Sequence, residues 1–177
     1  MAKITPRYDL PNAAPGSLRF VQRFVNTVNL ERGDDWLAAW LEEQGVGSPS
    51  AAELARARRV REALRELLYA NNGFAADGEP GPVLTEAGRR AALTVDFSRG
   101  QLVSAADGVD GVLGAVLGAA FAAMAAGTWP RLKACRNHGC RWAFYDYSKN
   151  RSAGWCSMQL CGNRAKTRAY RRRQRTA

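Results

Sequence analysis

Apolar residues recur at the three- and four-residue spacing of a helix along most of the first 130 residues of the chain. The spacing predicts helices over residues 17–30, 36–45, 50–71, 85–92 and 110–126. Between the last two of these, apolar and polar residues alternate around Arg99-Gly100, which predicts one β-hairpin over residues 93–105. We therefore expect a mainly α fold with a small β-hairpin (α+β), and a helical domain that ends where Gly127 and Pro130 interrupt the last helix.

The long predicted helix opens with a Ser-x-x-Glu capping box at Ser50 and Glu53. Three of its arginines, Arg58, Arg61 and Arg65, lie away from its apolar stripe. Glutamates at helical spacing can pair with them along the helix. We interpret these arginines as a solvated face rather than a phosphate clamp.

Two polar residues stand in the otherwise apolar first helix. Asn26 and Thr27 need hydrogen-bond partners if they are buried there. One interpretation is a ligand pocket for a small-molecule effector, lined by these two residues with Trp36 and Trp40. The other is that they tie down a neighbouring loop.

Residues 111–130 carry no charge, and Ala and Gly make up most of them. The strongly apolar part spans about 15 residues, which is short of the ~20 that a bilayer needs. Gly114 and Gly118, at four-residue spacing, would let a second helix of a soluble protein approach closely. The first residues lack the apolar core of a signal peptide. We therefore expect a cytoplasmic protein without a membrane partner.

Positive charge gathers at the end of the chain. Residues 1–130 hold 13 Lys and Arg against 15 Asp and Glu, a net charge of −2. Residues 131–177 hold 13 Lys and Arg against Asp146 alone, a net charge of +12. So uneven a distribution predicts a polyanionic partner for the last segment.

All four cysteines lie in that basic segment, as C-x4-C-x15-C-x4-C at Cys135, Cys140, Cys156 and Cys161. Two close pairs separated by about 15 residues are typical of a four-thiolate zinc site. A segment this small needs the metal in order to fold. Four protein ligands leave no open position, so we predict one structural Zn²⁺. His138, the one histidine of the chain, lies between two ligands and completes nothing that the thiolates lack.

Between the two cysteine pairs, residues 142–146 are rich in aromatic side chains and predict a strand, with a turn at residues 148–150. Trp142, Phe144, Tyr147 and Trp155 can form a small core that covers the metal. In the alternative, aromatic residues among bases stack on single-stranded nucleic acid. Asp146 is expected to accept hydrogen bonds from the local backbone or from an arginine.

The chain ends in a stretch of high helix propensity, residues 164–175. Basic side chains occur nearly all round this predicted helix. A helix with this charge distribution fits a nucleic-acid groove lined with phosphates. The residues predicted to bind nucleic acid are Arg164, Lys166, Arg168, Arg171, Arg172, Arg173 and Arg175.

The segment from Cys135 to Tyr170 resembles the CGNR zinc-finger family. The tetrapeptide that names the family stands here as Cys161-Gly162-Asn163-Arg164. The pattern Phe-x-Asp-x-Ser-x-Asn is met by residues 144–150. In one departure from many members, which carry bases just before the tryptophan, this chain has Ala153-Gly154.

The front part is similar to the helical ABATE domain that precedes this finger. The matching features are residues 24–27, the Trp-Leu-x-x-Trp-Leu of residues 36–41, and residues 59–64. The resemblance implies a bacterial transcription regulator linked to stress, with a zinc finger that binds DNA.

We predict a helical regulatory or dimerising domain over residues 1–130 and a DNA-binding zinc finger over residues 131–177. The front domain shows no catalytic constellation, so we expect no enzyme. A homodimer is expected, because a single finger reads too few bases for genomic specificity. Two alternatives stay open. One is an RNA-binding module that uses Trp142, Tyr145 or Tyr147, and the other is a front-domain sensor or enzyme with the finger as a structural clip.

Overall fold

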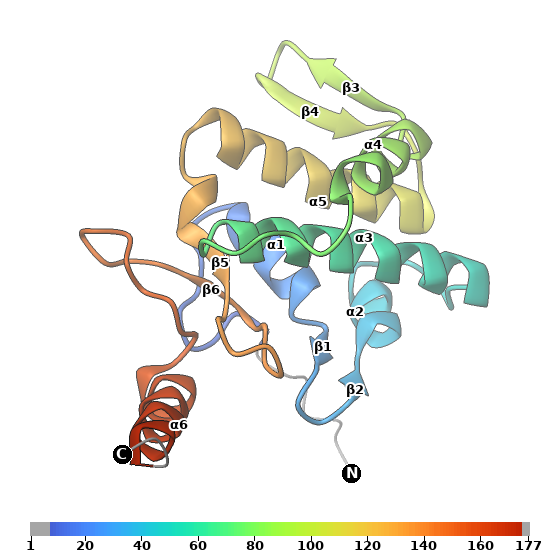
Figure 1. Ribbon diagram of the computed structural model, residues 1–177. Coiled ribbons are helices and arrows are strands. Elements are labelled where there is room, and N and C mark those ends of the chain that lie inside the picture. The colour runs from blue at the N-terminus through green and yellow to red at the C-terminus, as the bar shows by residue number, and fades with distance from the viewer. Residues whose placement is uncertain (1–7, 175–177) are drawn as a thin grey trace.

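The computed structural model describes residues 8–174 of the chain, and six α-helices lie within them. Their bounds are α1 Leu18–Val25, α2 Leu37–Glu43, α3 Ala51–Ala70, α4 Pro80–Arg90, α5 Gly108–Ala125 and α6 Asn163–Gln174. A short 3₁₀-helix, η1, spans Trp129–Arg131, and a π-helical turn, η2, spans Met158–Gly162. Figure 1 shows α1, α3, α4 and α5 packed together, with α6 apart from them at the other end of the molecule.

The strands form three separate antiparallel pairs. They are β1 Val28–Asn29 with β2 Asp34–Asp35, β3 Leu93–Asp96 with β4 Gln101–Ser104, and β5 Leu132–Ala134 with β6 Ala143–Tyr145. The predicted β-hairpin is therefore confirmed, and the mainly α fold with small sheets is confirmed with it. The third pair carries the first two cysteines in the loop that joins its two strands, with Cys135 directly after β5.

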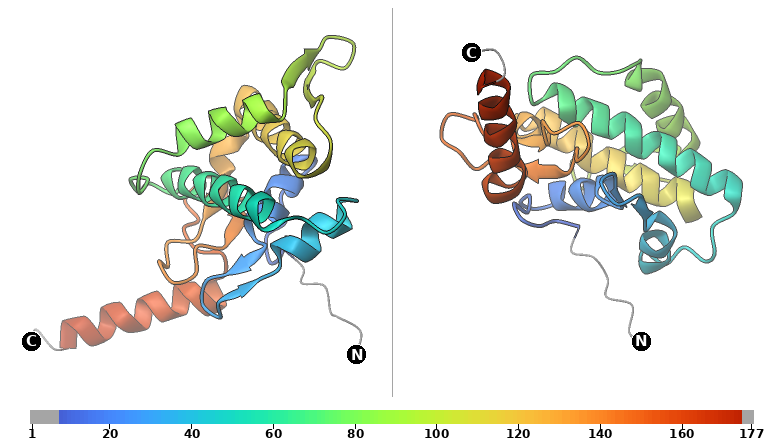
Figure 2. Two further views of the ribbon diagram at one scale, coloured as in Figure 1. Left: turned by 90° about the vertical axis from the view of Figure 1, so that its right-hand side faces the viewer. Right: turned by 60° about the horizontal axis from the view of Figure 1, so that its bottom comes forward.

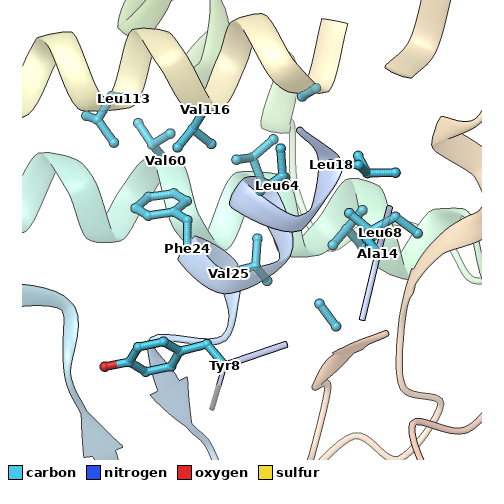
Figure 3. Close-up of a cluster of buried hydrophobic side chains, with 14 of the residues drawn as sticks. Tyr8, Ala14, Leu18, Phe24, Val25, Val60, Leu64, Leu68, Leu113 and Val116 are labelled. Atoms are coloured by element: carbon cyan, nitrogen blue, oxygen red, sulfur yellow. The ribbon is translucent and has the colours of Figure 1, made fainter. Parts of the chain in front are cut away.

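The main core lies between α1, α3 and α5. Figure 3 shows Phe24 and Val25 of α1 facing Val60 and Leu64 of α3, with Leu113 of α5 above them. The same core continues into the basic segment, since it includes Leu132, Ala134, Ala143 and Tyr145 of the third strand pair. The helical part and the cysteine-bearing part of the chain thus bury apolar surface against each other.

Two predicted helix boundaries are wrong. The first helix ends at Val25 rather than near residue 30, because the chain turns there into β1. The fourth begins at Pro80 rather than at Thr85. Its glycine- and proline-rich start resembles a loop, yet proline suits the first turn of a helix, where its missing N–H is not needed. The capping box at Ser50 is confirmed, since its hydroxyl accepts from the Glu53 amide while the Glu53 carboxylate accepts from the Ser50 amide.

Helix α5 runs through the packed helices and contacts α1, α3, α4 and β4. Among the described residues it is the one helix long and apolar enough to cross a membrane, a test that a buried core helix of a soluble protein also passes. Gly114 and Gly118 allow a close approach, as predicted, but the element that approaches is β4 and not a second helix. A Cβ on Gly114 would lie 2.7 Å from the Cβ of Ser104, and one on Gly118 would lie 3.0 Å from the Leu102 carbonyl oxygen.

The interpretation of Arg61 and Arg65 as a solvated face is wrong, because both side chains are buried. The Arg61 guanidinium donates to the Asp35 carboxylate at 2.8 Å and to the Thr27 hydroxyl at 3.1 Å. The Arg65 guanidinium donates to the Val25 carbonyl at 2.5 Å and to the Arg141 carbonyl at 2.9 Å. Helical spacing places Arg61 and Arg65 outside the apolar stripe of α3. The segments that contain their hydrogen-bond partners cover this side of the helix as well.

Candidate metal centre and nucleic-acid interface

The four cysteines come together at one point. Their Sγ atoms all lie within 4.8 Å of one another, although the two pairs come from separate turns. Cys156 Sγ lies 3.7 Å from the Sγ atoms of both Cys140 and Cys161. A zinc–sulfur distance of about 2.3 Å gives sulfur–sulfur edges of about 3.8 Å in a tetrahedron. A disulfide, in contrast, needs about 2.05 Å. The spacing therefore fits one structural zinc ion, as the sequence predicts.

The ionisation of the four thiols also favours a bound cation. Hydrogen bonds from Cys140 and Cys156 lower the pKa of the Cys135 thiol to about 2. The contact with Cys135 in turn raises the pKa of Cys140 and of Cys156. One thiolate therefore suppresses the ionisation of its neighbours, and several thiolates can coexist at these distances when a divalent cation compensates their charge.

Aromatic side chains cover part of this cluster. Phe144 is buried against the cysteines, and Trp142 and Trp155 pack at its edge, as predicted. Tyr147 was expected there, but its side chain is exposed and contacts the ring of Tyr145. Its hydroxyl donates to the Ala13 carbonyl at 2.6 Å, so Tyr147 holds the arm that precedes α1.

The residues of the Cys-Gly-Asn-Arg tetrapeptide each have a local role. Gly162 leaves room for the Met158 side chain, because a Cβ there would lie 2.7 Å from the Met158 sulfur. The Asn163 amide donates back to the Gln159 carbonyl at 3.2 Å, across the π-helical turn. Arg164 then opens the exposed part of α6. The tetrapeptide thus joins the last metal ligand directly to the basic helix.

The loop between β6 and Cys156 is held by a buried ion pair. Lys133 Nζ donates to Asp146 Oδ2 at 2.7 Å and to the Arg151 carbonyl at 2.6 Å. Burial alone would raise the pKa of the Asp146 carboxyl, but the bonds from Lys133 and Ser148 outweigh it and lower that pKa. Asp146 therefore accepts hydrogen bonds as expected, although its charged partner is a lysine and not an arginine.

Side chains of the front helices bond directly to the backbone of the cysteine-bearing segment. Asn26 accepts from the Ala143 amide at 2.7 Å and donates to the Ala143 carbonyl at 2.9 Å. Gln22 donates to the same carbonyl at 3.2 Å, and Asn72 donates to the Ala134 carbonyl at 2.8 Å. Gln22 and Asn72 were not among the residues predicted from the sequence. Gln22 carries a signal, a polar residue among the apolar positions of the first helix, whereas Asn72 falls in a stretch whose composition predicts a loop.

The predicted pocket residues lie among these contacts or in the core. Asn26 and Thr27 are fully buried and bonded within the chain, which agrees with the interpretation that they tie down a neighbouring segment. Trp40 is buried between Phe20 and Phe24, and Trp36 packs near Tyr8. A ligand pocket at these four residues stays a prediction.

Helix α6 carries six basic residues and no acidic residue, and none of its described residues is buried. Figure 2 shows it projecting from the body of the molecule. Of the residues predicted to bind nucleic acid, it holds Arg164, Lys166, Arg168, Arg171, Arg172 and Arg173. Arg175 lies outside the described residues. A helix that buries nothing gains little from tertiary packing, and its charge suits a polyanion.

A concavity of about 640 Å³ lies between the turn at residues 136–139 and one side of α6. Arg164, Arg168 and Arg172 line it from successive turns of the helix, and Arg136 and Trp155 line it from the metal centre. The Arg136 guanidinium lies in the space that a side chain at Gly154 would fill, 2.5 to 2.8 Å from the ideal Cβ position. Arg136 thus brings positive charge to the place where the chain lacks the bases expected before Trp155.

Comparison with known families accounts for nearly the whole described chain. A model described as "CGNR zinc finger" matches residues 131–174, and a model described as ABATE, "Putative stress-induced transcription regulator", matches residues 18–128. The chain belongs to the ABATE family. The resemblance noted in the sequence is thereby confirmed for both parts. A search of curated proteins finds no match to the chain.

The two matches of this ABATE protein adjoin between residues 128 and 131, beside the boundary expected at residue 130. The division into domains 1–130 and 131–177 stays a prediction, since the strands of the finger share the core of the front helices. The finger is the CGNR type in its ligands and in the tetrapeptide that leads into α6.

Proposed function

We propose that this ABATE protein is a transcription regulator that binds duplex DNA with α6 and the adjoining concavity. The observation that carries the proposal is the exposed helix α6, with six bases and no acid, attached directly to the last cysteine of the metal centre. Zinc has a structural role here: it fixes the turn from which the helix starts. The proposal includes a cytoplasmic location, where thiols stay reduced, and no catalytic step.

The RNA alternative draws less support from the contacts of its aromatic residues. Trp142 Nε1 donates to the Leu10 carbonyl at 2.7 Å, and the Tyr147 hydroxyl donates to the Ala13 carbonyl. Tyr145 is buried. Stacking on single-stranded RNA would have to release Trp142 and Tyr147 from the arm before α1, or expose the buried Tyr145. Competition between single-stranded RNA and duplex DNA at matched salt separates the two functions, and preference for RNA would contradict our proposal.

Binding of the zinc-loaded protein to duplex DNA, titrated at several salt concentrations, tests the proposal. The double variant Arg168→Gln/Arg171→Gln removes two exposed charges from α6. We expect its affinity to fall about tenfold, and the slope of log K against log salt to lose about 2 units. The matched control is Arg89→Gln/Arg99→Gln, which removes two exposed charges from the front part. Equal binding by the two double variants would contradict the proposal.

A further inference from the structure

One acidic side chain reaches the basic concavity. Among its described lining residues Glu31 is the one acid, against Arg136, Arg164, Arg168 and Arg172. Glu31 Oε1 accepts from Arg164 Nη1 at 2.7 Å and from Asn137 Nδ2 at 3.2 Å. A carboxylate of the front part of the chain thus bonds to the first arginine of α6 and to the turn between two metal ligands.

The position of Glu31 is built into the turn between β1 and β2. The Asn29 side chain accepts from the amides of Glu31 and Arg32, at 3.0 and 3.2 Å, which fixes the start of the turn. Gly33 closes it at φ +76°, a conformation that suits glycine. In the left view of Figure 2 the start of α6 lies next to this turn, in agreement with the bond between Arg164 and Glu31. The turn therefore presents Glu31 to Arg164 without help from a long flexible loop.

The two donors that hold Glu31 form a site for an oxygen anion. Guanidinium and amide N–H groups bind a phosphate oxygen as readily as a carboxylate oxygen. Arg168 and Arg172 follow Arg164 at intervals of one helical turn along the same wall. Such a row fits a chain of phosphates better than a single free ion. The pair is reachable from solvent, with side-chain exposures of 36% for Glu31 and 53% for Arg164.

We propose that Glu31 occupies the site of a nucleic-acid phosphate, so that the β1–β2 turn competes with DNA for Arg164 and Asn137. This inference rests on the proposed function and adds a binding site and its competitor to it. Bound DNA displaces the carboxylate and places a phosphodiester oxygen between the two donors. Asn137 also donates to Cys161 Sγ at 3.7 Å, so the same side chain links the phosphate site to the metal centre.

The test compares Glu31→Gln with Glu43→Gln. Both remove one negative charge, but Glu43 pairs with Arg23 on the front helices. We expect Glu31→Gln to bind duplex DNA about two- to fivefold more tightly than Glu43→Gln at low salt, which is the range of one exposed ion pair. The slope of log K against log salt should be the same for both variants, because Arg164 contacts a phosphate in each bound complex. Zinc content and unfolding midpoint confirm that both variants are folded.

The Arg164→Gln background shows whether the effect passes through Arg164. In that background, Glu31→Gln and Glu43→Gln should bind DNA equally. A second arm replaces DNA with inorganic phosphate, and a gain for that ion alone would contradict a nucleic-acid site. Equal binding of DNA by the two glutamate variants would overturn the inference while leaving the proposed function standing. If the wild-type chain bound no nucleic acid, the proposed function would fail and the inference with it.

Discussion

Lys133 and Asp146 show how two residues can stabilise the conformation of the finger. The two side chains are buried together, and their bonds hold the loop that leads to Cys156. Removing one partner of a buried pair leaves the other charge without compensation, which costs about 3–5 kcal/mol. Neither Lys133 nor Asp146 is a metal ligand, yet their ion pair holds the loop that positions Cys156 and Cys161.

Asp146 should therefore contribute to the pH dependence of stability. The pKa of its carboxyl is lower in the folded protein than in the unfolded chain. The stabilisation is present above the ordinary carboxyl pKa of about 3.9 and is lost as pH falls through the lower folded value. We expect Asp146→Asn to destabilise the protein at pH 7 by about 3–5 kcal/mol.

Urea unfolding between pH 7 and pH 2.5 checks this. The difference between wild type and Asp146→Asn should shrink as the pH falls, because protonation removes the same charge from the wild type. Asn150 is exposed, so Asn150→Ala serves as the control. It should change neither the stability at pH 7 nor its dependence on pH. A difference that stayed constant across the range would contradict the role given to the Asp146 carboxylate.

At the scale of elements, α5 and β4 meet through glycines. The helix bears no side chain at Gly114 and Gly118, and the strand lies in the space that this leaves. A glycine inside a helix costs about 1 kcal/mol relative to alanine. The close packing of the hairpin on the helix offsets that cost.

Gly114→Ala should consequently destabilise the protein, although alanine favours helices. Its Cβ would meet Ser104 and Ala91 at 2.7 and 2.8 Å, and overpacking of this kind costs about 1–3 kcal/mol. Gly81→Ala in α4 is the matched control, since no heavy atom lies within 4 Å of its ideal Cβ. Chemical denaturation should show a loss for the first variant and no loss for the second. Two equal shifts would refute the packing argument.

The finger itself depends on zinc, because its own apolar cluster is small. That cluster is centred on Phe144 and the cysteines. We expect Cys156→Ser to lose the zinc ion and to unfold residues 131–174, as free energy on the order of 10 kcal/mol comes from metal binding in peptides of this kind. Zinc stoichiometry by mass spectrometry and near-ultraviolet circular dichroism measure both effects. Full zinc content in this variant would contradict the four-thiolate site.

At the scale of the whole molecule, the finger and the front helices depend on each other. Arg65, Asn71 and Asn72 of the α3 region donate to carbonyls between residues 129 and 154. The Arg141 guanidinium lies over the Tyr69 ring and pairs with Glu66. Because these bonds cross from one part of the chain to the other, loss of the metal should be felt in α3.

Hydrogen exchange with and without a zinc chelator tests this coupling. We expect protection to fall about tenfold or more in residues 64–72 as well as in the finger, because opening one element frees the bonds of the other. The β3–β4 hairpin serves as the internal control, since it packs on α5 at the far side of the helices (Figure 1). A change confined to residues 131–174 would show that the two parts open independently.

Sequence alone was enough to predict the features that repeat or stand close together along the chain. The cysteine spacing predicts the metal centre, the alternation predicts the hairpin, and the capping box predicts the start of α3. In each of these cases the partners are close along the chain: the cysteines of each pair share one turn, the two strands are joined by one turn, and the capping box lies within the first turn of one helix. The concentration of charge in the last 47 residues likewise needs no fold to be seen.

Tertiary structure decided which polar side chains are buried and what they bind. Arg65 and Asn26 find partners 40 and 117 residues away. Glu31 meets Arg164 across 133 residues. No periodicity along the chain predicts such pairs, because each depends on two surfaces that come together only when the core forms. The sequence therefore predicts the metal ligands and the basic helix of the finger. Only the tertiary structure shows how the finger is attached to the front helices and that Glu31 contacts Arg164.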